Sequence, residues 1–118
     1  MRLDKLAKIA VSALEDIKAR DITVLDVRKL TSFADTLVIA SADSSRQVKA
    51  LARHVREKLE VAGASIVGVE GEEGAEWVLV DAGDIVVHVM QPAVRAYYNL
   101  EELWTARPAR RAPAATAA

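Results

Sequence analysis

Cysteine is absent from the 118-residue sequence, so disulfide bonds and thiolate metal ligands are excluded. Aromatic residues are scarce as well: two tryptophans, two tyrosines and one phenylalanine. Neither sign of charge dominates, since 16 basic residues stand against 17 acidic ones, and this balance does not indicate a globally nucleic-acid-binding protein. The N-terminal segment lacks the unbroken apolar run of a signal peptide or a membrane span, so we expect a cytoplasmic protein without membrane contact.

What the chain does have is enough apolar sequence for a core, with 52% hydrophobic residues in one domain-sized length. Apolar periodicity predicts the element order α-β-β-α-β-β-β-α. This order is typical of the α/β (α+β) class, as a single domain with a five-stranded mixed sheet and flanking helices. The predicted helices span 3–20, 44–63 and 92–104, and the predicted strands span 22–27, 36–41, 65–70, 76–81 and 84–89. We assign 1–104 to the domain and interpret 105–118 as a disordered Ala/Pro/Arg tail.

Local signals define the ends of the middle helix. Ser44 followed by Gln47 three residues later is a capping box at its start. Gly63 lies where a glycine commonly follows a helix C-cap. The segment DSSR (43–46) also opens a helix after a strand, but without a glycine-rich phosphate loop capping explains it better than anion binding does.

Only Ala82 and Gly83 separate Asp81 from Asp84, which predicts a hairpin with a two-residue turn. That turn would pair Trp77 with His88 across the two strands. Because side chains alternate, Trp77 and His88 would share one face with both aspartates. The other face would be purely aliphatic core, formed by Val78, Val80, Ile85, Val87 and Val89.

The predicted last helix has more apolar surface than one sheet contact can bury. Its narrow polar strip consists of Arg95, Asn99 and Glu102. The remaining arc contains both tyrosines, Trp104 and, among them, Glu101. This arc is either intramolecular core or a surface for a second helix, a second copy or a partner, and the pattern alone leaves these alternatives open.

An enzyme hypothesis would rest on Asp35, Asp81, Asp84 and His88. The two aspartates beside the turn could hold a divalent metal, but no third ligand lies at a diagnostic spacing, and turn acids more often bond the turn backbone. His88 has no nucleophile paired with it in the sequence. The segment 70–76 contains four glutamates, which form a solvated loop or complement a basic partner. These patterns favour a binding protein without a cofactor over an enzyme.

Two segments, WVLVDAGDIVVHVM (77–90) and VRAYYNLEELW (94–104), resemble the signature of the ribosomal silencing factor family, also called the Iojap family. FADTLVIASADSSRQVKALARHV (33–55) and VEG (69–71) resemble further family segments, so the likeness spans about residues 4–104. The chain departs from the family at Thr36, Ala82 and Met90, where aromatics are common. The matching positions are Trp77, Asp81, Gly83, Asp84, His88, Arg95, Tyr98, Leu100, Glu101, Leu103 and Trp104.

The resemblance implies a translational repressor. Family members bind the large ribosomal subunit through its protein fourteen, block association with the small subunit, and silence translation during starvation or stationary phase. The implied fold is nucleotidyltransferase-like without the catalytic motif, and free relatives often form homodimers. Organelle relatives act in large-subunit assembly, so an assembly factor is one alternative and a nucleotidyltransferase-like enzyme is another.

The residues expected to bind the ribosomal protein combine acidic side chains with aromatic anchors. Arg107, Arg110 and Arg111 in the tail would add at most a minor rRNA contact. The expected partner-binding set is Glu70, Glu72, Glu73, Trp77, Asp81, His88, Arg95, Tyr98, Glu101 and Trp104.

Overall fold

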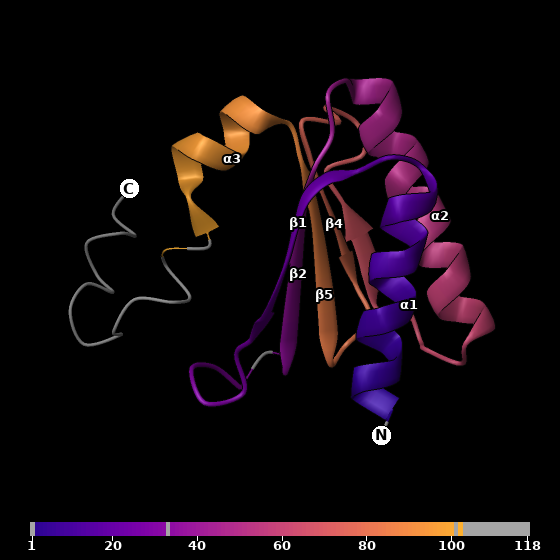
Figure 1. The fold of residues 1–118 in the computed structure, drawn as a ribbon. Coiled ribbons are helices and arrows are strands. Elements are labelled where there is room, and N and C mark those ends of the chain that lie inside the picture. The colour runs from indigo at the N-terminus through magenta and orange to yellow at the C-terminus, as the bar shows by residue number, and fades with distance from the viewer. Residues whose placement is uncertain (1, 33, 101, 103–118) are drawn as a thin grey trace.

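A computed structural model describes residues 2–32, 34–100 and 102, and shows the predicted fold class, a single α+β domain around one five-stranded mixed sheet. Helices α1 and α2 cover one face of the sheet, and α3 lies on the opposite side (Figure 1). The eight elements follow the predicted order: α1 (Arg2–Asp16), β1 (Arg20–Asp26), β2 (Thr36–Ser41), α2 (Ser45–Val61), β3 (Gly68–Glu70), β4 (Trp77–Asp81), β5 (Ile85–Met90) and α3 (Pro92–Tyr98).

The strands are arranged β1-β2-β5-β4-β3, with β2 and β5 parallel at the centre and every other pair antiparallel. Parallel neighbours cannot be joined by a tight turn, so the chain leaves β2 through α2 before it returns to the sheet. Every residue of β2 is buried, as expected for a strand covered on both faces.

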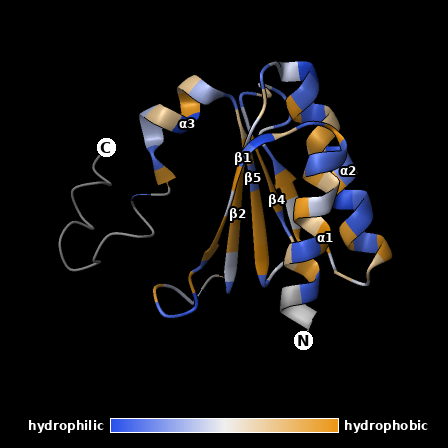
Figure 2. Cartoon of the chain, in the orientation of Figure 1, coloured by the Kyte–Doolittle hydropathy of each residue, from blue (hydrophilic) through white to orange (hydrophobic). Residues whose placement is uncertain are grey.

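The main core lies between the sheet and the helices α1 and α2. The predicted aliphatic face of the hairpin is confirmed, since all five of its residues are fully buried. They pack against the apolar stripes of the two helices, which include Ala10, Ala13, Leu14, Val48, Leu51, Val55 and Leu59. Figure 2 shows the same division, with hydrophobic strands inside and hydrophilic residues along the outer surfaces of α1 and α2.

The predicted ends of the middle helix are confirmed. The Ser44 hydroxyl accepts a hydrogen bond from the Gln47 backbone N–H at 3.1 Å, while the Gln47 side chain accepts from the Asp43 N–H at 2.8 Å. Gly63 follows the helix with φ +100°, and the Ala64 N–H donates back to the Leu59 carbonyl at 2.9 Å. A left-handed glycine with this return bond is the usual way to end a helix.

The predicted hairpin register is wrong by two residues. The turn consists of Gly83 and Asp84, and the Ala82 N–H donates to the Ile85 carbonyl at 2.9 Å. Trp77 therefore pairs with Met90, and His88 pairs with Leu79. Gly83 has φ +84°, so the turn places glycine first, where a positive φ is needed. A shift by an even number leaves every side chain on its predicted face.

Some predicted boundaries also differ. Helix α1 ends at Asp16, not at 20, because Lys18 is left-handed (φ +62°) and the Ala19 N–H closes the helix on the Leu14 carbonyl at 3.0 Å. Strand β3 contains three residues, not six. Helix α3 ends at Tyr98, because Asn99 is left-handed (φ 47°, ψ 55°), a conformation that asparagine tolerates. The predicted tail, 105–118, lies outside the described residues.

Candidate functional site: an aromatic cluster on the open face of the sheet

The face of the sheet opposite α1 and α2 is only partly covered. A small second core lies there, formed by Val27, Leu37, Ile39 and Met90. Around it the apolar side chains are only partly buried, among them Leu25, Trp77, Val86, Val94 and Leu100. This face therefore combines a buried centre with accessible apolar rims, unlike the fully buried opposite face.

Four aromatic rings meet on this open face, and we call Trp77, His88, Tyr97 and Tyr98 the aromatic cluster. The indole Nε1–H of Trp77 donates to Nδ1 of His88 at 2.9 Å, and these two rings have centroids 5.9 Å apart. The Trp77 and Tyr98 centroids are 4.9 Å apart, and Tyr97 meets Tyr98 edge-on at the same distance. Such tilted and edge-on contacts suit the quadrupoles of the rings.

His88 serves the cluster as a neutral hydrogen-bond acceptor. Burial lowers the pKa of its imidazole to about 4, so the ring is uncharged near neutral pH. Since Nδ1 accepts the Trp77 N–H, the proton of the neutral ring is assigned to Nε2. A buried indole N–H needs a partner, and His88 supplies it while it fixes the orientation of Trp77.

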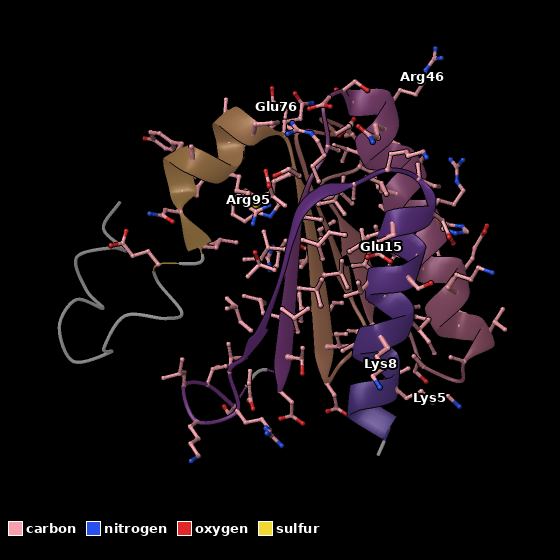
Figure 3. The ribbon with its side chains drawn as sticks, viewed as in Figure 1. Lys5, Lys8, Glu15, Arg46, Glu76 and Arg95 are labelled. Atoms are coloured by element: carbon pink, nitrogen blue, oxygen red, sulfur yellow. The ribbon has the colours of Figure 1, made fainter. Side chains whose placement is uncertain are left out.

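Arg95 anchors α3 to the sheet. In the predicted polar strip, Asn99 and Glu102 are exposed, but Arg95 is only 9% exposed and points toward β1 and β2 (Figure 3). Its guanidinium donates to the Asp21 carbonyl at 2.7 Å, the Ser41 hydroxyl at 2.8 Å and the Thr23 hydroxyl at 3.1 Å. Rigid, forked donors suit a buried site of this kind. The next turn of α3 carries the two tyrosines, so Arg95 also sets their position.

The surroundings of the cluster are acidic. Glu70, Glu72, Glu73 and Glu76 are exposed, on β3 and the loop that leads to β4. Gly71 brings this loop against β4: a Cβ there would lie 2.1 Å from the Trp77 carbonyl oxygen. Between residues 64 and 104 the only lysine or arginine is the buried Arg95. In the described part of the chain none of these glutamates forms an ion pair, so the loop presents negative charge beside the first residue of β4.

The structure brings together only some of the predicted site residues. Trp77, His88 and Tyr98 are in contact, Arg95 joins the helix that carries Tyr98 to the sheet, and the glutamates border β4. Asp81 is at the far end of β4 from Trp77. Glu101 and Trp104 lie outside the described residues. The sequence analysis did not select Tyr97, which is 81% exposed; its place in the apolar arc of the last helix was the only signal.

Two of the enzyme candidates, Asp81 and His88, have side chains in hydrogen bonds that support the fold. The Asp81 carboxylate accepts the Gly83 N–H at 2.9 Å, which is the turn-bonding role expected of such acids. The backbone N–H groups of Asp35 and Thr36 both donate to the Asp84 carbonyl, at 2.8 and 3.1 Å. Among the described residues no group of three or more histidine, aspartate or glutamate side chains is placed to hold a metal. No helix in the described ranges is long and apolar enough to cross a membrane.

The fold and the site together define a small α+β domain that displays an aromatic cluster in acidic surroundings. Residues 1–117 match the family model described as "Ribosomal silencing factor during starvation". The chain belongs to this family, which is not an enzyme family.

Sequence relatives support the same family assignment. A ribosomal silencing factor of Chromobacterium violaceum is 59% identical over 104 residues, which cover 88% of this chain and 85% of the relative. A silencing factor of Bacillus subtilis is 41% identical over 108 residues, or 92% of each chain. A mouse protein named "Mitochondrial assembly of ribosomal large subunit protein 1" is 36% identical over 100 residues, which cover 82% of this chain and 44% of that protein.

Solved structures show the same fold. A crystal structure of a Chromobacterium violaceum protein has a TM-score of 0.87 and 57% identity, and the match covers 91% of this chain and 89% of that one. A Bacillus halodurans structure has a TM-score of 0.77 and 40% identity, with 86% and 94% covered.

Proposed function

We propose that this chain is a cytoplasmic translational repressor that binds the large ribosomal subunit through its protein fourteen and sterically blocks association with the small subunit. Membership of the silencing factor family supports the general role. The observation that carries the docking surface is the aromatic cluster, half-open to solvent on the face that α1 and α2 do not cover.

Exposed aromatics of this kind are suited to a protein partner. Tyr98 is 54% exposed and packs against Trp77 of β4, and Tyr97 is 81% exposed and meets Tyr98 edge-on. Tryptophan and tyrosine are enriched among the residues that dominate binding energy. The glutamates beside the cluster would attract a basic partner and exclude acidic ones. A steric repressor needs such a surface and its own bulk, and no catalytic group.

Sedimentation tests this proposal. The full chain is mixed with separated small and large subunits, the magnesium concentration is raised, and the mixture is run on a sucrose gradient. We expect the chain to travel with the large subunit and the joined-ribosome peak to fall. A chain that stays at the top of the gradient would contradict the proposal.

Matched variants then locate the surface. Tyr98→Ala and the double charge reversal Glu72→Lys with Glu73→Lys are expected to weaken large-subunit binding while the protein stays folded. Val61→Ala is the control, because Val61 is 85% exposed at the end of α2, on the helix-covered side. Equal binding by all three variants would remove the aromatic cluster and the acidic loop from the interface.

A second candidate, a large-subunit assembly factor, is favoured by the name of the mouse relative. It predicts that loss of the protein leads to accumulation of precursor large subunits even in rich medium. If the chain binds large subunits and subunit joining is unaffected, this candidate replaces the first. We also propose that free chains pair as homodimers, which sedimentation equilibrium of the purified protein would show.

A further inference from the structure

The charges of this nearly neutral chain are strongly segregated. Helix α2 contains five lysines and arginines and two glutamates. The segment from 64 to 104 contains eight acidic residues and only one basic residue, Arg95. The two charge populations therefore belong to different elements. The glutamates of β3 and of the loop before β4 lie beside the aromatic cluster, whereas α2 covers the opposite face of the sheet (Figure 1).

Four of the α2 cations form a row, which we call the α2 stripe: Arg46, Lys49, Arg53 and Arg56. Their spacing of three and four residues places them within an arc of about 80° on the helix, and the row is about 15 Å long. All four are exposed. The buried residues of α2, such as Leu51 and Val55, occupy the other side of the helix and pack on the sheet.

The charges of the stripe are mostly uncompensated within the molecule. In the described part of the chain, Arg46, Lys49 and Arg53 form no ion pair, and Arg56 has a long contact of 3.6 Å with Glu60. Figure 3 shows Arg46 pointing away from the body of the molecule. The first turn of α2 contains no acidic residue, although the helix dipole favours one there. Helix stability therefore does not explain this pattern.

The stripe is better matched to a nucleic acid than to a membrane. A helix that binds a membrane surface needs its apolar face free to enter the lipid, but Val48, Leu51, Ala52, Val55 and Leu59 are all buried against the sheet. A row of mainly arginine forks at helical spacing instead matches successive phosphate groups. The open sheet face already presents the opposite charge, so a single partner of uniform charge would not suit both faces.

We infer that the α2 stripe binds the phosphodiester backbone of RNA, on the side of the domain opposite the aromatic cluster. The contact is electrostatic and independent of base sequence, because backbone contacts position a protein without reading bases. Glu57 and Glu60 lie on the same exposed side of α2 and moderate the attraction, so a modest affinity is expected. The inference does not depend on the proposed repressor function, since it concerns different residues.

The salt dependence of RNA binding provides the test. The full chain is titrated into a fluorescently labelled single-stranded RNA oligomer at several salt concentrations, and anisotropy is recorded. Four phosphate contacts predict a slope of log K against log salt of about −2.8, or roughly a 50-fold loss of affinity between about 50 and 200 mM salt. The double variant Arg46→Gln with Arg53→Gln should halve the slope and reduce that loss to about 7-fold.

The matched control removes the same amount of charge elsewhere. Lys5 and Lys8 line a shallow groove between α1 and α2 together with Lys58, at the end of α1 away from Arg46 (Figure 3). Lys5→Gln with Lys8→Gln should therefore keep the full slope. Tyr98→Ala should also keep it, because the aromatic cluster lies on the other face of the sheet.

Four results would overturn the inference. These are no RNA binding at low salt, an equal loss in the stripe and lysine variants, a loss of RNA binding in Tyr98→Ala, and binding to anionic lipid vesicles but not to RNA. Circular dichroism of each variant shows whether it is folded. If the stripe double variant unfolds, the single variant Arg53→Gln, expected to reduce the slope by about a quarter, replaces it.

Discussion

The two faces of the sheet are made by the same strands and differ in almost every other respect. On the face covered by α1 and α2, the hairpin contributes four valines and Ile85, all fully buried. On the other face, the neighbouring positions of the same strands carry Trp77, Leu79, Asp81, Val86 and His88, all partly exposed. The backbone is common to both, so the difference comes from the side chains that alternate to each face and from the helices that cover them.

This contrast separates stability from recognition. Burial of aliphatic side chains stabilises the fold in proportion to the apolar area removed from water. A partly covered face keeps apolar and aromatic area that a partner can still bury. Substitutions on the covered face should therefore affect folding, and substitutions on the open face should affect binding.

The largest expected effect is on the covered face. Leu51→Ala leaves a cavity among fully buried neighbours and should reduce the free energy of unfolding by about 2–5 kcal/mol. Urea unfolding measures this loss. The fraction that remains folded should bind large subunits with unchanged affinity. If Leu51→Ala bound large subunits more weakly under conditions in which it is fully folded, the two faces would not be separate in function.

The next effect is a pH dependence that originates on the open face. The pKa of His88 is lowered to about 4 in the folded chain, while an unfolded histidine has an ordinary pKa near 6.5. Between these values the unfolded chain binds more protons, so stability is complete above about pH 6.5 and falls as the pH drops toward 4. The shift corresponds to about 3 kcal/mol.

The variant His88→Gln should lose this dependence. Urea unfolding at several pH values between 4 and 6.5 compares it with the natural chain. The difference in stability between the two should shrink as the pH falls. Only the natural chain has an imidazole at this position, and that imidazole takes up a proton when the chain unfolds. A constant difference would show that burial of His88 does not control its protonation.

A smaller effect is expected at the junction between the faces. Arg95→Met removes three hydrogen bonds, to the Asp21 carbonyl and to the Ser41 and Thr23 hydroxyls, at a cost of about 2 kcal/mol. The loss should be local: amide exchange in 93–98 should accelerate more than in β2. Trp77 emission should change in a Trp104→Phe background, because Tyr98 would no longer be held against the indole. Arg95→Lys should restore part of the order, and unchanged exchange in α3 would contradict the anchoring role.

The smallest effect on stability is expected at Tyr97. Its side chain is 81% exposed, so Tyr97→Ala should change the free energy of unfolding by less than about 0.5 kcal/mol. If the open face is the docking surface, the same change should weaken large-subunit binding measurably. Thermal unfolding and co-sedimentation, carried out on one preparation, separate the two readouts. A destabilised protein with normal binding would reverse the assignment of this residue.

Much of the fold was predictable because it depends on local patterns. Strand β2 was predicted with its observed limits, since a short apolar run rich in β-branched residues is typical of a strand buried on both faces. The cap at Ser44 and the glycine after α2 depend on neighbouring residues, and both predictions are confirmed. The hairpin register was less predictable, because two adjacent two-residue turns fit the sequence DAGD and backbone geometry selects between them.

The candidate site was predictable in its residue types but not in their roles. Trp77, His88 and Tyr98 were identified, yet no pattern indicates that one ring nitrogen of His88 accepts the indole N–H. A helical wheel identifies Arg95 only as a polar residue of the last helix. Its burial depends on the Thr23 and Ser41 hydroxyls, which lie 72 and 54 positions away in the chain.

The sequence by itself determined the element order, the aliphatic face of the hairpin, the two ends of α2 and the segregation of charge. Each of these follows from residues close together in the chain, through periodicity, turn chemistry or composition. Tertiary structure alone decided which face of the sheet α3 partly covers, which arginine is buried and which rings are in contact. Those outcomes depend on contacts between residues far apart in the chain, where the spacing along the sequence contains no information about distance.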